Sequence, residues 1–166
     1  LSAWVWLNES SYEKNKRTGE YYSQITVQDT PSGISGTVYN IEVLAAEEDH
    51  LVVSGVNDPC IAGANETVKV EVEDQYGNRV LVSTVTVHFT SDDPSATLPA
   101  DYTFDSTTDQ GYHVFGNEVV FKTAGTRYIK AEVVGSTWIY GIQSAIDVYP
   151  AEAASFVVSC STNQVI

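Results

Sequence analysis

The chain repeats part of its own sequence after about one domain length. Residues 41–55 match residues 146–160 without a gap, and Gly36 and Gly141 keep the same spacing of 105 positions. After a one-residue slip the spacing becomes 106 for two further pairs, Tyr22 with Tyr128 and Val27 with Val133. Such self-similarity is typical of tandem domains, because single domains commonly have about 100–150 residues. The sequence therefore predicts tandem repeats.

The register of the repeat predicts the boundaries of the domains. Residues 1–45 correspond to the C-terminal half of a repeat, residues 46–150 to a complete repeat, and residues 151–166 to the start of a following one. Half a domain exposes an unpaired sheet edge and half a core, so we expect another segment to cover residues 1–45. The sequence leaves two alternatives open: the chain belongs to a longer tandem array, or another copy completes it.

Hydrophobic and polar residues alternate along several segments of the complete repeat. Val68, Val70 and Val72 alternate with charged residues, and the same period of two recurs in residues 84–90 and 128–133. This period indicates strands with one buried face, and the Asp, Gly and Pro clusters between them indicate turns. About seven such strands without a convincing helix predict an all-β fold of antiparallel β-sandwiches. The predicted core consists of Val68, Val70, Val72, Val87, Phe89, Ile129, Val133, Ile146 and Val148.

Four segments of the complete repeat resemble a known family in their order and spacing. They are residues 70–78 (VEVEDQYGN), 88–94 (HFTSDDP), 96–104 (ATLPADYTF) and 121–128 (FKTAGTRY). These segments are similar to the immunoglobulin-like, filamin-type repeats of large prokaryotic cell-surface proteins, whereas residues 1–17 have no counterpart in that pattern. The resemblance implies tandem immunoglobulin-like sandwiches, one complete and one partial. It also implies an extracellular or cell-surface location and a structural or adhesive role without catalysis.

The charge of the chain excludes some classes of partner. Its 166 residues include 22 Asp and Glu against 8 Lys and Arg, which gives a formal net charge of −14. Nucleic acid is therefore not expected as a partner, because phosphate contacts need clustered basic residues. No apolar run approaches the roughly 20 residues of a membrane span, so no span is predicted in this segment.

The three histidines form no recognisable catalytic set. His50 lies at the junction between repeats, His88 on the outward face of a predicted strand, and His113 after a predicted turn. No nucleophile motif or paired-histidine spacing accompanies them. Three surface histidines are the simpler interpretation, and we expect the chain not to be an enzyme.

Cys60 and Cys160 lie near the starts of successive repeats, although their positions are not equivalent. Two cysteines in an exported protein indicate a disulfide, and a bond between them would clamp the junction after Pro150. Such a bond requires the two Cα atoms to lie within about 7 Å of each other. The sequence leaves two buried thiols, or a bond to another chain, as alternatives.

Two glycosylation sequons begin at Asn8 and Asn65, and both lie beside polar turns. Asn-x-Ser/Thr sequences in exposed loops of exported proteins are acceptors for N-linked glycans. Both asparagines are therefore candidates for modification, with chance occurrence in a chain rich in Ser and Thr as the alternative.

Two groups of acids are candidate calcium ligands. Asp92 and Asp93 share one predicted turn, and Glu47, Glu48 and Asp49 lie at the first junction between repeats. Calcium takes six to eight oxygen ligands, and loops between β-domains can supply them. The chain has no Asp-x-Asp-x-Asp-Gly loop, and the alternative is that dispersed acids keep the surface soluble.

Two functions fit the sequence. The first is a structural repeat module of a filament, surface layer or stalk, whose partners are copies of itself or neighbouring repeats. The second is an adhesin or carbohydrate-binding module, for which an exposed aromatic platform is expected. The candidate rings for that platform are Tyr102, Tyr112, Trp138 and Tyr140.

The repeat also predicts an assembly strand near the end of the sequence. Phe156, Val157 and Val158 correspond to the first strand of a repeat. One chain can extend or complete the sheet of another through such a strand. We therefore expect residues 156–166 to pack with the N-terminal half-domain of a neighbour in a head-to-tail filament, or the equivalent contact to form within a longer chain.

Overall fold

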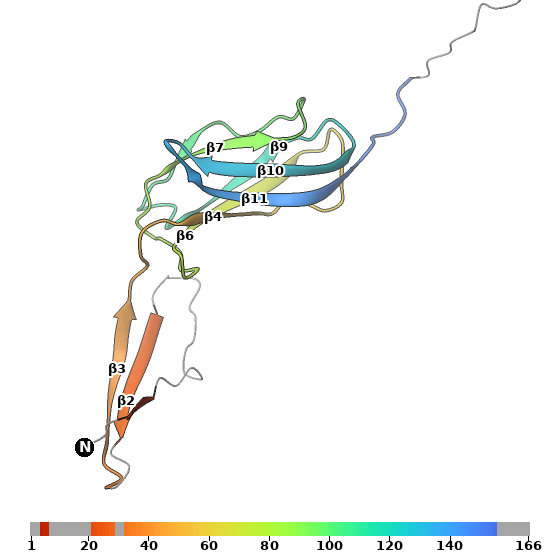
Figure 1. The fold of residues 1–166 in the computed structure, drawn as a ribbon. Helices are drawn as coiled ribbons and strands as arrows, with labels where there is room; N and C mark the ends of the chain where they lie inside the picture. Colours follow the sequence, from red (N-terminus) through yellow and green to blue (C-terminus); the bar gives the residue numbers. More distant parts are fainter. Residues whose placement is uncertain (1–3, 7–20, 29–31, 156–166) are drawn as a thin grey trace, which may run out of the picture.

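The computed structural model describes residues 4–6, 21–28 and 32–155, and all regular secondary structure within them is β. The prediction of an all-β fold is therefore confirmed. The described residues form no helix, so none of them crosses a membrane in helical form. Figure 1 shows a layered domain that contains β4 to β11 and a separate N-terminal sheet that contains β1 to β3.

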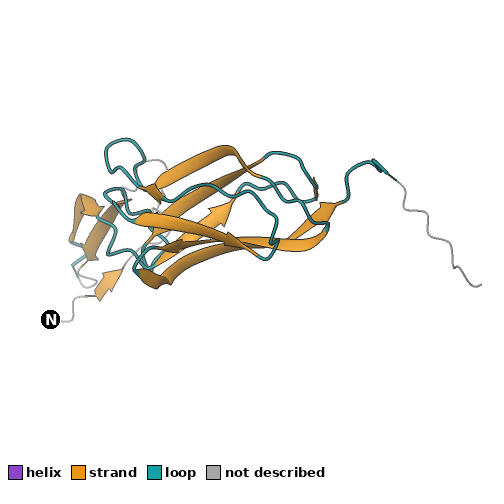
Figure 2. Ribbon diagram, turned by 90° about the horizontal axis from the view of Figure 1, so that it is seen from above, coloured by secondary structure: helices purple, strands orange, loops and turns teal. Residues whose placement is uncertain are grey.

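Two sheets lie in the layered domain and enclose its core (Figure 2). The first has the order β4-β6-β9 and consists of His50–Ser54, Glu66–Glu73 and Tyr112–Val119. The second has the order β5-β11-β10-β7-β8 and consists of Cys60–Ile61, Ser136–Tyr149, Gly125–Val133, Thr86–Ser91 and Tyr102–Thr103. Each sheet thus combines strands that are distant in the sequence.

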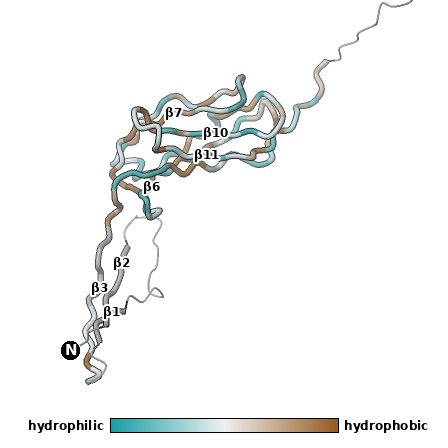
Figure 3. Tube along the Cα trace, in the orientation of Figure 1, coloured by the Kyte–Doolittle hydropathy of each residue, from teal (hydrophilic) through white to brown (hydrophobic). Residues whose placement is uncertain are grey.

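The core lies between the two sheets and contains the residues expected from the period of two. All nine predicted core residues are buried, and Val68, Val70, Val87, Ile129 and Ile146 have no exposed surface. Along β6, buried and half-buried residues alternate without interruption. Figure 3 shows the same change between hydrophobic and hydrophilic residues along the strands of this domain. Alternation therefore fixes which face of each strand is inside.

The short strand β5 departs from the predicted antiparallel arrangement. Cys60 pairs with Val148 in a parallel ladder, so β5 runs in the same direction as β11. The chain leaves β4 in one sheet, passes Gly55 at a φ of 103°, and reaches the edge of the other sheet. The segment from β4 to β5 therefore contributes one strand to each sheet. Because the chain crosses between the sheets at Gly55, β5 runs parallel to β11.

The N-terminal sheet has the order β1-β2-β3 and consists of Trp4–Trp6, Tyr21–Gln28 and Ser35–Val43. Within it β1 and β3 are the two edge strands. In the layered domain the equivalent edge of β11 is occupied by β5.

The hairpin β2–β3 has the same register as the hairpin β10–β11. The seven pairs of the first hairpin are Tyr21 with Val43, Tyr22 with Glu42, Ser23 with Ile41, Ile25 with Val38, Thr26 with Thr37, Val27 with Gly36, and Gln28 with Ser35. Their counterparts are Gly125 with Val148, Thr126 with Asp147, Arg127 with Ile146, Ile129 with Gln143, Lys130 with Ile142, Ala131 with Gly141, and Glu132 with Tyr140. One irregularity of the ladder also falls at the same place, after Ser23 and after Arg127, and the hairpin β10–β11 has a further one after Glu132.

The register corrects one part of the sequence alignment. Residues of β3 and β11 are 105 positions apart, as Val43 and Val148 are, but Tyr21 and Gly125 in the preceding strands are 104 apart. The predicted spacing of 106 for Tyr22 with Tyr128 and for Val27 with Val133 is therefore wrong by two residues. The connection between the strands is one residue longer in the second hairpin, so the spacing falls from 105 to 104 in the preceding strand, whereas the alignment had raised it to 106. A shift of two keeps every side chain on its predicted face, so the face pattern alone did not reveal it.

Candidate functional site

The strand β4 lies against β11 at a glycine. A Cβ atom on Gly141 would lie 2.1 Å from the carbonyl oxygen of Leu51 and 3.1 Å from Cγ2 of Val53. No side chain fits in that space, so β4 and β11 approach across the two sheets only because residue 141 is glycine. This contact closes one side of the domain.

The segment after β4 continues along β11 through hydrogen bonds between side chains and the backbone. The side-chain amide of Gln143 accepts from the N–H of Val56 at 3.1 Å and donates to its carbonyl at 2.8 Å. Further along, the carboxylate of Asp58 accepts from the N–H of Asp147 at 2.9 Å. Residues 51–61 therefore follow β11 from Gly141 to the pairing of Cys60 with Val148. We call this course the first-strand seat.

Gly36 on β3 is the counterpart of Gly141 in the N-terminal hairpin. Gly36 has the register position of Gly141. A Cβ atom on Gly36 would meet no atom of the described residues within 4 Å. Gly36 is also exposed. The hairpin β2–β3 thus has the glycine of the seat, and within residues 4–6, 21–28 and 32–155 no strand lies against it.

Asp74 ties the junction between the two parts of the chain to the turn after β6. Its side chain is fully buried, and one carboxylate oxygen accepts from the N–H of Ala46 at 2.8 Å. The other oxygen accepts from the N–H groups of Tyr76 and Asn78. Burial alone would raise the pKa of Asp74, but these hydrogen bonds outweigh it and lower the pKa. The charged carboxylate is therefore a structural anchor.

The loop at Asp92 and Asp93 is held together by hydrogen bonds to its carboxylates. Asp93 accepts from the backbone N–H groups of Lys122 at 2.6 Å and Thr123 at 2.9 Å, and also from the Thr123 hydroxyl. Asp92 accepts from the N–H of Tyr128 at 2.9 Å. Burial opposes the charge on Asp93, but the hydrogen bonds lower its pKa to about 2. The geometry of Asp93 is that of a loop-closing carboxylate, and calcium at Asp92 and Asp93 stays a prediction.

Asp109 is the centre of a third buried carboxylate cluster, which the sequence pattern did not single out. The Tyr102 hydroxyl donates to it at 3.0 Å, and Nδ1 of His113 lies 2.8 Å from it. The rings of Tyr102 and His113 stack with centroids 3.9 Å apart. Burial would raise the pKa of Asp109, but hydrogen bonds from the Asp105 N–H, His113 and Tyr102 lower it. His113 is therefore partly buried in a packed cluster and not the surface histidine that was expected.

The other predicted acids border a hollow at the junction. Glu47, Glu48 and Asp49 line a hollow of about 380 Å³ together with Ala46 and Gln75. Asp49 also lies 3.2 Å from Nδ1 of His50. The described residues contain no group of three or more His, Cys, Asp or Glu side chains arranged to hold a metal ion. Calcium at residues 47–49 stays a prediction.

The remaining predicted sites divide between the described and undescribed parts of the chain. Cys60 is buried and unbonded, and burial, followed by the nearby charges of Glu66 and Asp58, raises its pKa. Asn65 is exposed immediately before β6, as a glycan acceptor must be. The predicted sites that lie outside the described residues are Cys160, Asn8, Phe156, Val157 and Val158.

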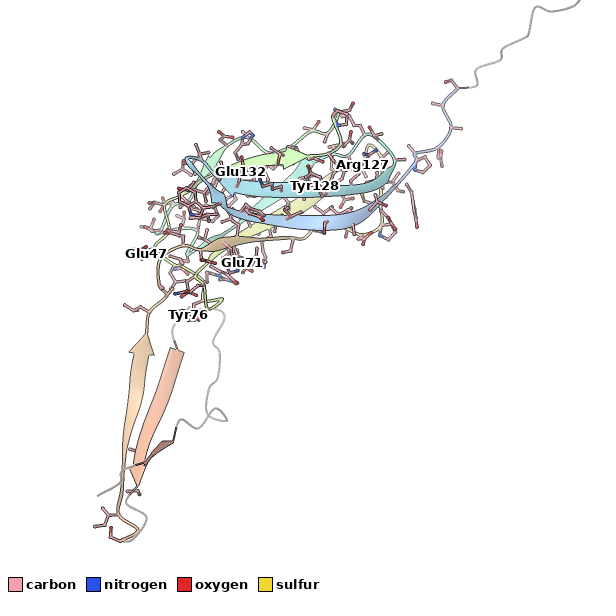
Figure 4. The ribbon with its side chains drawn as sticks, viewed as in Figure 1. Glu47, Glu71, Tyr76, Arg127, Tyr128 and Glu132 are labelled. Carbon is pink, nitrogen blue, oxygen red and sulfur yellow. The ribbon has the colours of Figure 1, made fainter. Side chains whose placement is uncertain are left out.

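The four candidate rings of an aromatic platform do not share one face. Tyr102 packs against the core, and Tyr112 lies on the other sheet, where the Arg79 guanidinium sits 4.6 Å above its ring. Trp138 and Tyr140 are two positions apart on β11 and are 72% and 47% exposed. Tyr128 on the neighbouring strand β10 is also exposed, and Figure 4 shows it on the same strand as Glu132.

A cation lies among the rings of this face. The Lys130 ammonium sits 4.9 Å from the centre of the Tyr140 ring and 2.5 Å from the Glu132 carboxylate. Lys130 pairs with Ile142, which is also exposed. The outer face of β10 and β11 is therefore a mixed aromatic and charged surface.

Comparisons with known proteins identify no family. No family model matches the chain, and no curated protein matches its sequence. A chain of the beta-glucuronidase of Parabacteroides merdae is similar in structure, with 13% identity and a TM-score of 0.44. The similarity covers 86% of this chain and 20% of that chain.

Proposed function

We propose that this chain is a non-catalytic, immunoglobulin-like structural repeat module of an extracellular cell-surface assembly. The observation that carries the proposal is the shared register of the hairpins β2–β3 and β10–β11, including the position of the irregularity. Two hairpins with the same pairing, about one domain length apart, are what tandem repeats produce. Surface filaments, layers and stalks are built from such repeats.

The use of the titratable groups supports a structural role. The three buried aspartates Asp74, Asp93 and Asp109 each accept several hydrogen bonds from their own turns or from a neighbouring loop. Carboxylates used in this way stabilise loops and are not free to act as bases. His88 is paired with Asp101 at the surface, with 2.6 Å between them. A rigid, acidic module is well suited to an exposed position on a cell.

The proposal is tested by locating the protein on intact cells that naturally produce it. An antibody raised against residues 46–150 should label the outside of unpermeabilised cells, and brief external protease treatment should remove the signal. A cytoplasmic protein of known location serves as the control and should survive the protease. Labelling only after permeabilisation would overturn the proposal.

The second candidate function is carbohydrate binding by the outer face of β10 and β11. It is favoured by one observation, the exposure of Trp138, Tyr140 and Tyr128 on adjacent strands. Exposed aromatic rings with an apolar face and a polar edge are suited to stacking on sugar rings. Cosedimentation with insoluble cell-wall polysaccharide tests it. Trp138→Ala should abolish binding, whereas Tyr112→Ala on the other sheet should leave it unchanged, and equal binding by both variants would reject this candidate.

A further inference from the structure

We propose that the outer face of β10 and β11 binds the same face of a second copy of this chain, in a two-fold contact centred between Lys130 and Glu132. The inference deepens the proposed structural function and rests on it, because a module of an assembly must contact further copies. It adds the position of that contact, its symmetry and the residues that make it.

The outer face of β10 and β11 exposes several large apolar side chains close together. Tyr140 and Ile142 are both exposed and lie on either side of the buried Gly141 along β11. Trp138, two residues before Tyr140, is exposed as well, and so is Tyr128 on β10. Exposed apolar groups that gather on one sheet face favour a contact with another surface.

Two opposite charges lie in the middle of this face. Lys130 and Glu132 are two residues apart on β10, so their side chains share one side of the strand. Their charged groups form an ion pair of 2.5 Å. In the ladder with β11, Lys130 is opposite Ile142, and Glu132 is opposite Tyr140. We call these two cross-strand pairs the Lys130 row and the Glu132 row, and each row combines one charge with one apolar side chain.

Both rows continue with polar side chains on the neighbouring strand β7. In that ladder Thr90 is opposite Lys130, and His88 is opposite Glu132. His88 is exposed and Thr90 is half-buried. Each row therefore runs from a polar group on β7 through a charge on β10 to an apolar group on β11.

The two rows are complementary to each other, and this makes the face complementary to itself. A two-fold axis that runs across the strands between the rows brings the Lys130 row of each copy onto the Glu132 row of the other. Lys130 then faces Glu132 of the second copy, and Tyr140 faces Ile142 of the second copy. Opposite charges that meet in this way fix the register of an interface. Because facing sheets are rotated by about 30°, the match is closest at these two central rows.

The position of Lys130 favours a second copy over a sugar as the occupant. The Lys130 ammonium lies 4.9 Å from the centre of the Tyr140 ring and so covers one face of that ring. Stacking on a sugar needs an open ring face, whereas packing against Ile142 of a second copy can use the ring edge. The net charge of −14 does not prevent the contact, because charges more than about 8 Å apart are largely screened at about 0.15 M salt.

The test exchanges the two central charges in the full chain. Lys130→Glu places two acids at the centre of the face, and Glu132→Lys places two bases there. Two copies of the same variant then bring like charges together, so the dissociation constant of the dimer should rise more than about tenfold in each variant. Light scattering after size exclusion, over a series of concentrations, measures this constant, and the parent should form dimers. The matched control is Lys69→Glu, which makes the same change beside Glu71 on β6 in the other sheet and should dimerise like the parent.

Mixing the two charge variants keeps the result independent of how well one of them folds. Lys130→Glu and Glu132→Lys should together give a one-to-one dimer, because the acids of one chain meet the bases of the other. A chain with both substitutions should dimerise by itself, because its charge pattern is only reversed.

Several outcomes would overturn the inference. They are a parent that stays monomeric, charge variants that dimerise like the parent, a mixture without dimers, and a loss of dimers in Lys69→Glu. A monomeric parent that binds cell-wall polysaccharide, and loses that binding in Trp138→Ala, would make a glycan the occupant instead. Labelling of intact cells tests the proposed function independently of these masses, so the two proposals fail separately.

Discussion

The carboxylate of Asp74 accepts a hydrogen bond from the backbone N–H of Ala46 at 2.8 Å. Ala46 belongs to the junction between the N-terminal hairpin and the layered domain, whereas Asp74 begins the turn after β6. In Figure 4 Glu47 and Tyr76, the neighbours of this pair in the sequence, lie at the same end of the domain. One buried carboxylate therefore fastens the junction to the domain, beside the backbone hydrogen bond from Asp49 to Glu73.

Replacing Asp74 with alanine should loosen this junction. The variant leaves the N–H groups of Ala46, Tyr76 and Asn78 without their acceptor, and we expect a loss of about 3 kcal/mol in the free energy of unfolding. A glutamyl endopeptidase should also cleave after Glu47 and Glu48 faster than in the parent. Asp101→Ala, at an exposed pair with His88, is the control and should change neither measurement. Unchanged cleavage in Asp74→Ala would show that the junction is held by other contacts.

Gly141→Ala should strongly destabilise the layered domain. The new methyl group would lie 2.1 Å from the Leu51 carbonyl oxygen, so β4 must move away from β11. We expect a loss of about 3 kcal/mol or more, measured by urea unfolding. Gly116→Ala places a methyl group in open space on β9 and is the matched control. Equal midpoints for the two variants would contradict the close approach of the strands.

Val70→Asp should be among the most damaging changes in the chain. Val70 has no exposed surface, so the substitution places an unpaired carboxylate in the core at a cost of several kcal/mol. Val114→Asp introduces the same charge on the outer face of β9, where the side chain is 48% exposed, and should cost less than about 1 kcal/mol. Thermal unfolding of the two variants checks the assignment of strand faces. A Val70→Asp variant as heat-resistant as the parent would mean that the faces are inverted.

The sequence predicts local features of this fold well because they depend on short-range patterns. The buried faces of β6, β7, β10 and β11 follow from a period of two, and the matched segments 41–55 and 146–160 predict the equivalence of β3 and β11. Both signals are contained in a few consecutive residues.

Other features depend on contacts between distant residues and leave no such signal. The parallel pairing of Cys60 with Val148 joins residues far apart in the chain. The roles of Asp93 and Asp109 depend on which N–H groups reach them after folding. The turn sequences show where these aspartates lie, but an acid in a turn can equally be solvated, bind calcium or anchor a loop. The seat at Gly141 likewise became recognisable only from the distance to Leu51.

The last prediction concerns acid unfolding and Asp93. The pKa of Asp93 lies at about 2 in the folded protein, against an ordinary value of 3.8, because the hydrogen bonds of Lys122, Thr123 and Ser95 favour the charged form despite burial. A lowered pKa means that the unfolded chain takes up a proton first as the pH falls. The stabilisation is therefore complete well above pH 4, declines as the pH falls from 4 towards 2, and amounts to about 2 kcal/mol for a shift of this size.

Asp93→Asn removes the titrating group from the same loop. The variant should be less stable than the parent near neutral pH by about 2 kcal/mol, because an amide group replaces a charged acceptor of four hydrogen bonds. The difference between variant and parent should then shrink as the pH falls from 4 towards 2, since the parent loses the stabilisation that the variant never had. Glu118→Gln on the exposed part of β9 controls for the change in net charge. Its free energy of unfolding should equal that of the parent at every pH. Urea unfolding at a series of pH values measures the free energy of unfolding of all three chains. If the difference in this free energy between Asp93→Asn and the parent stays constant down to pH 2, the Asp93 carboxylate is not what closes the loop.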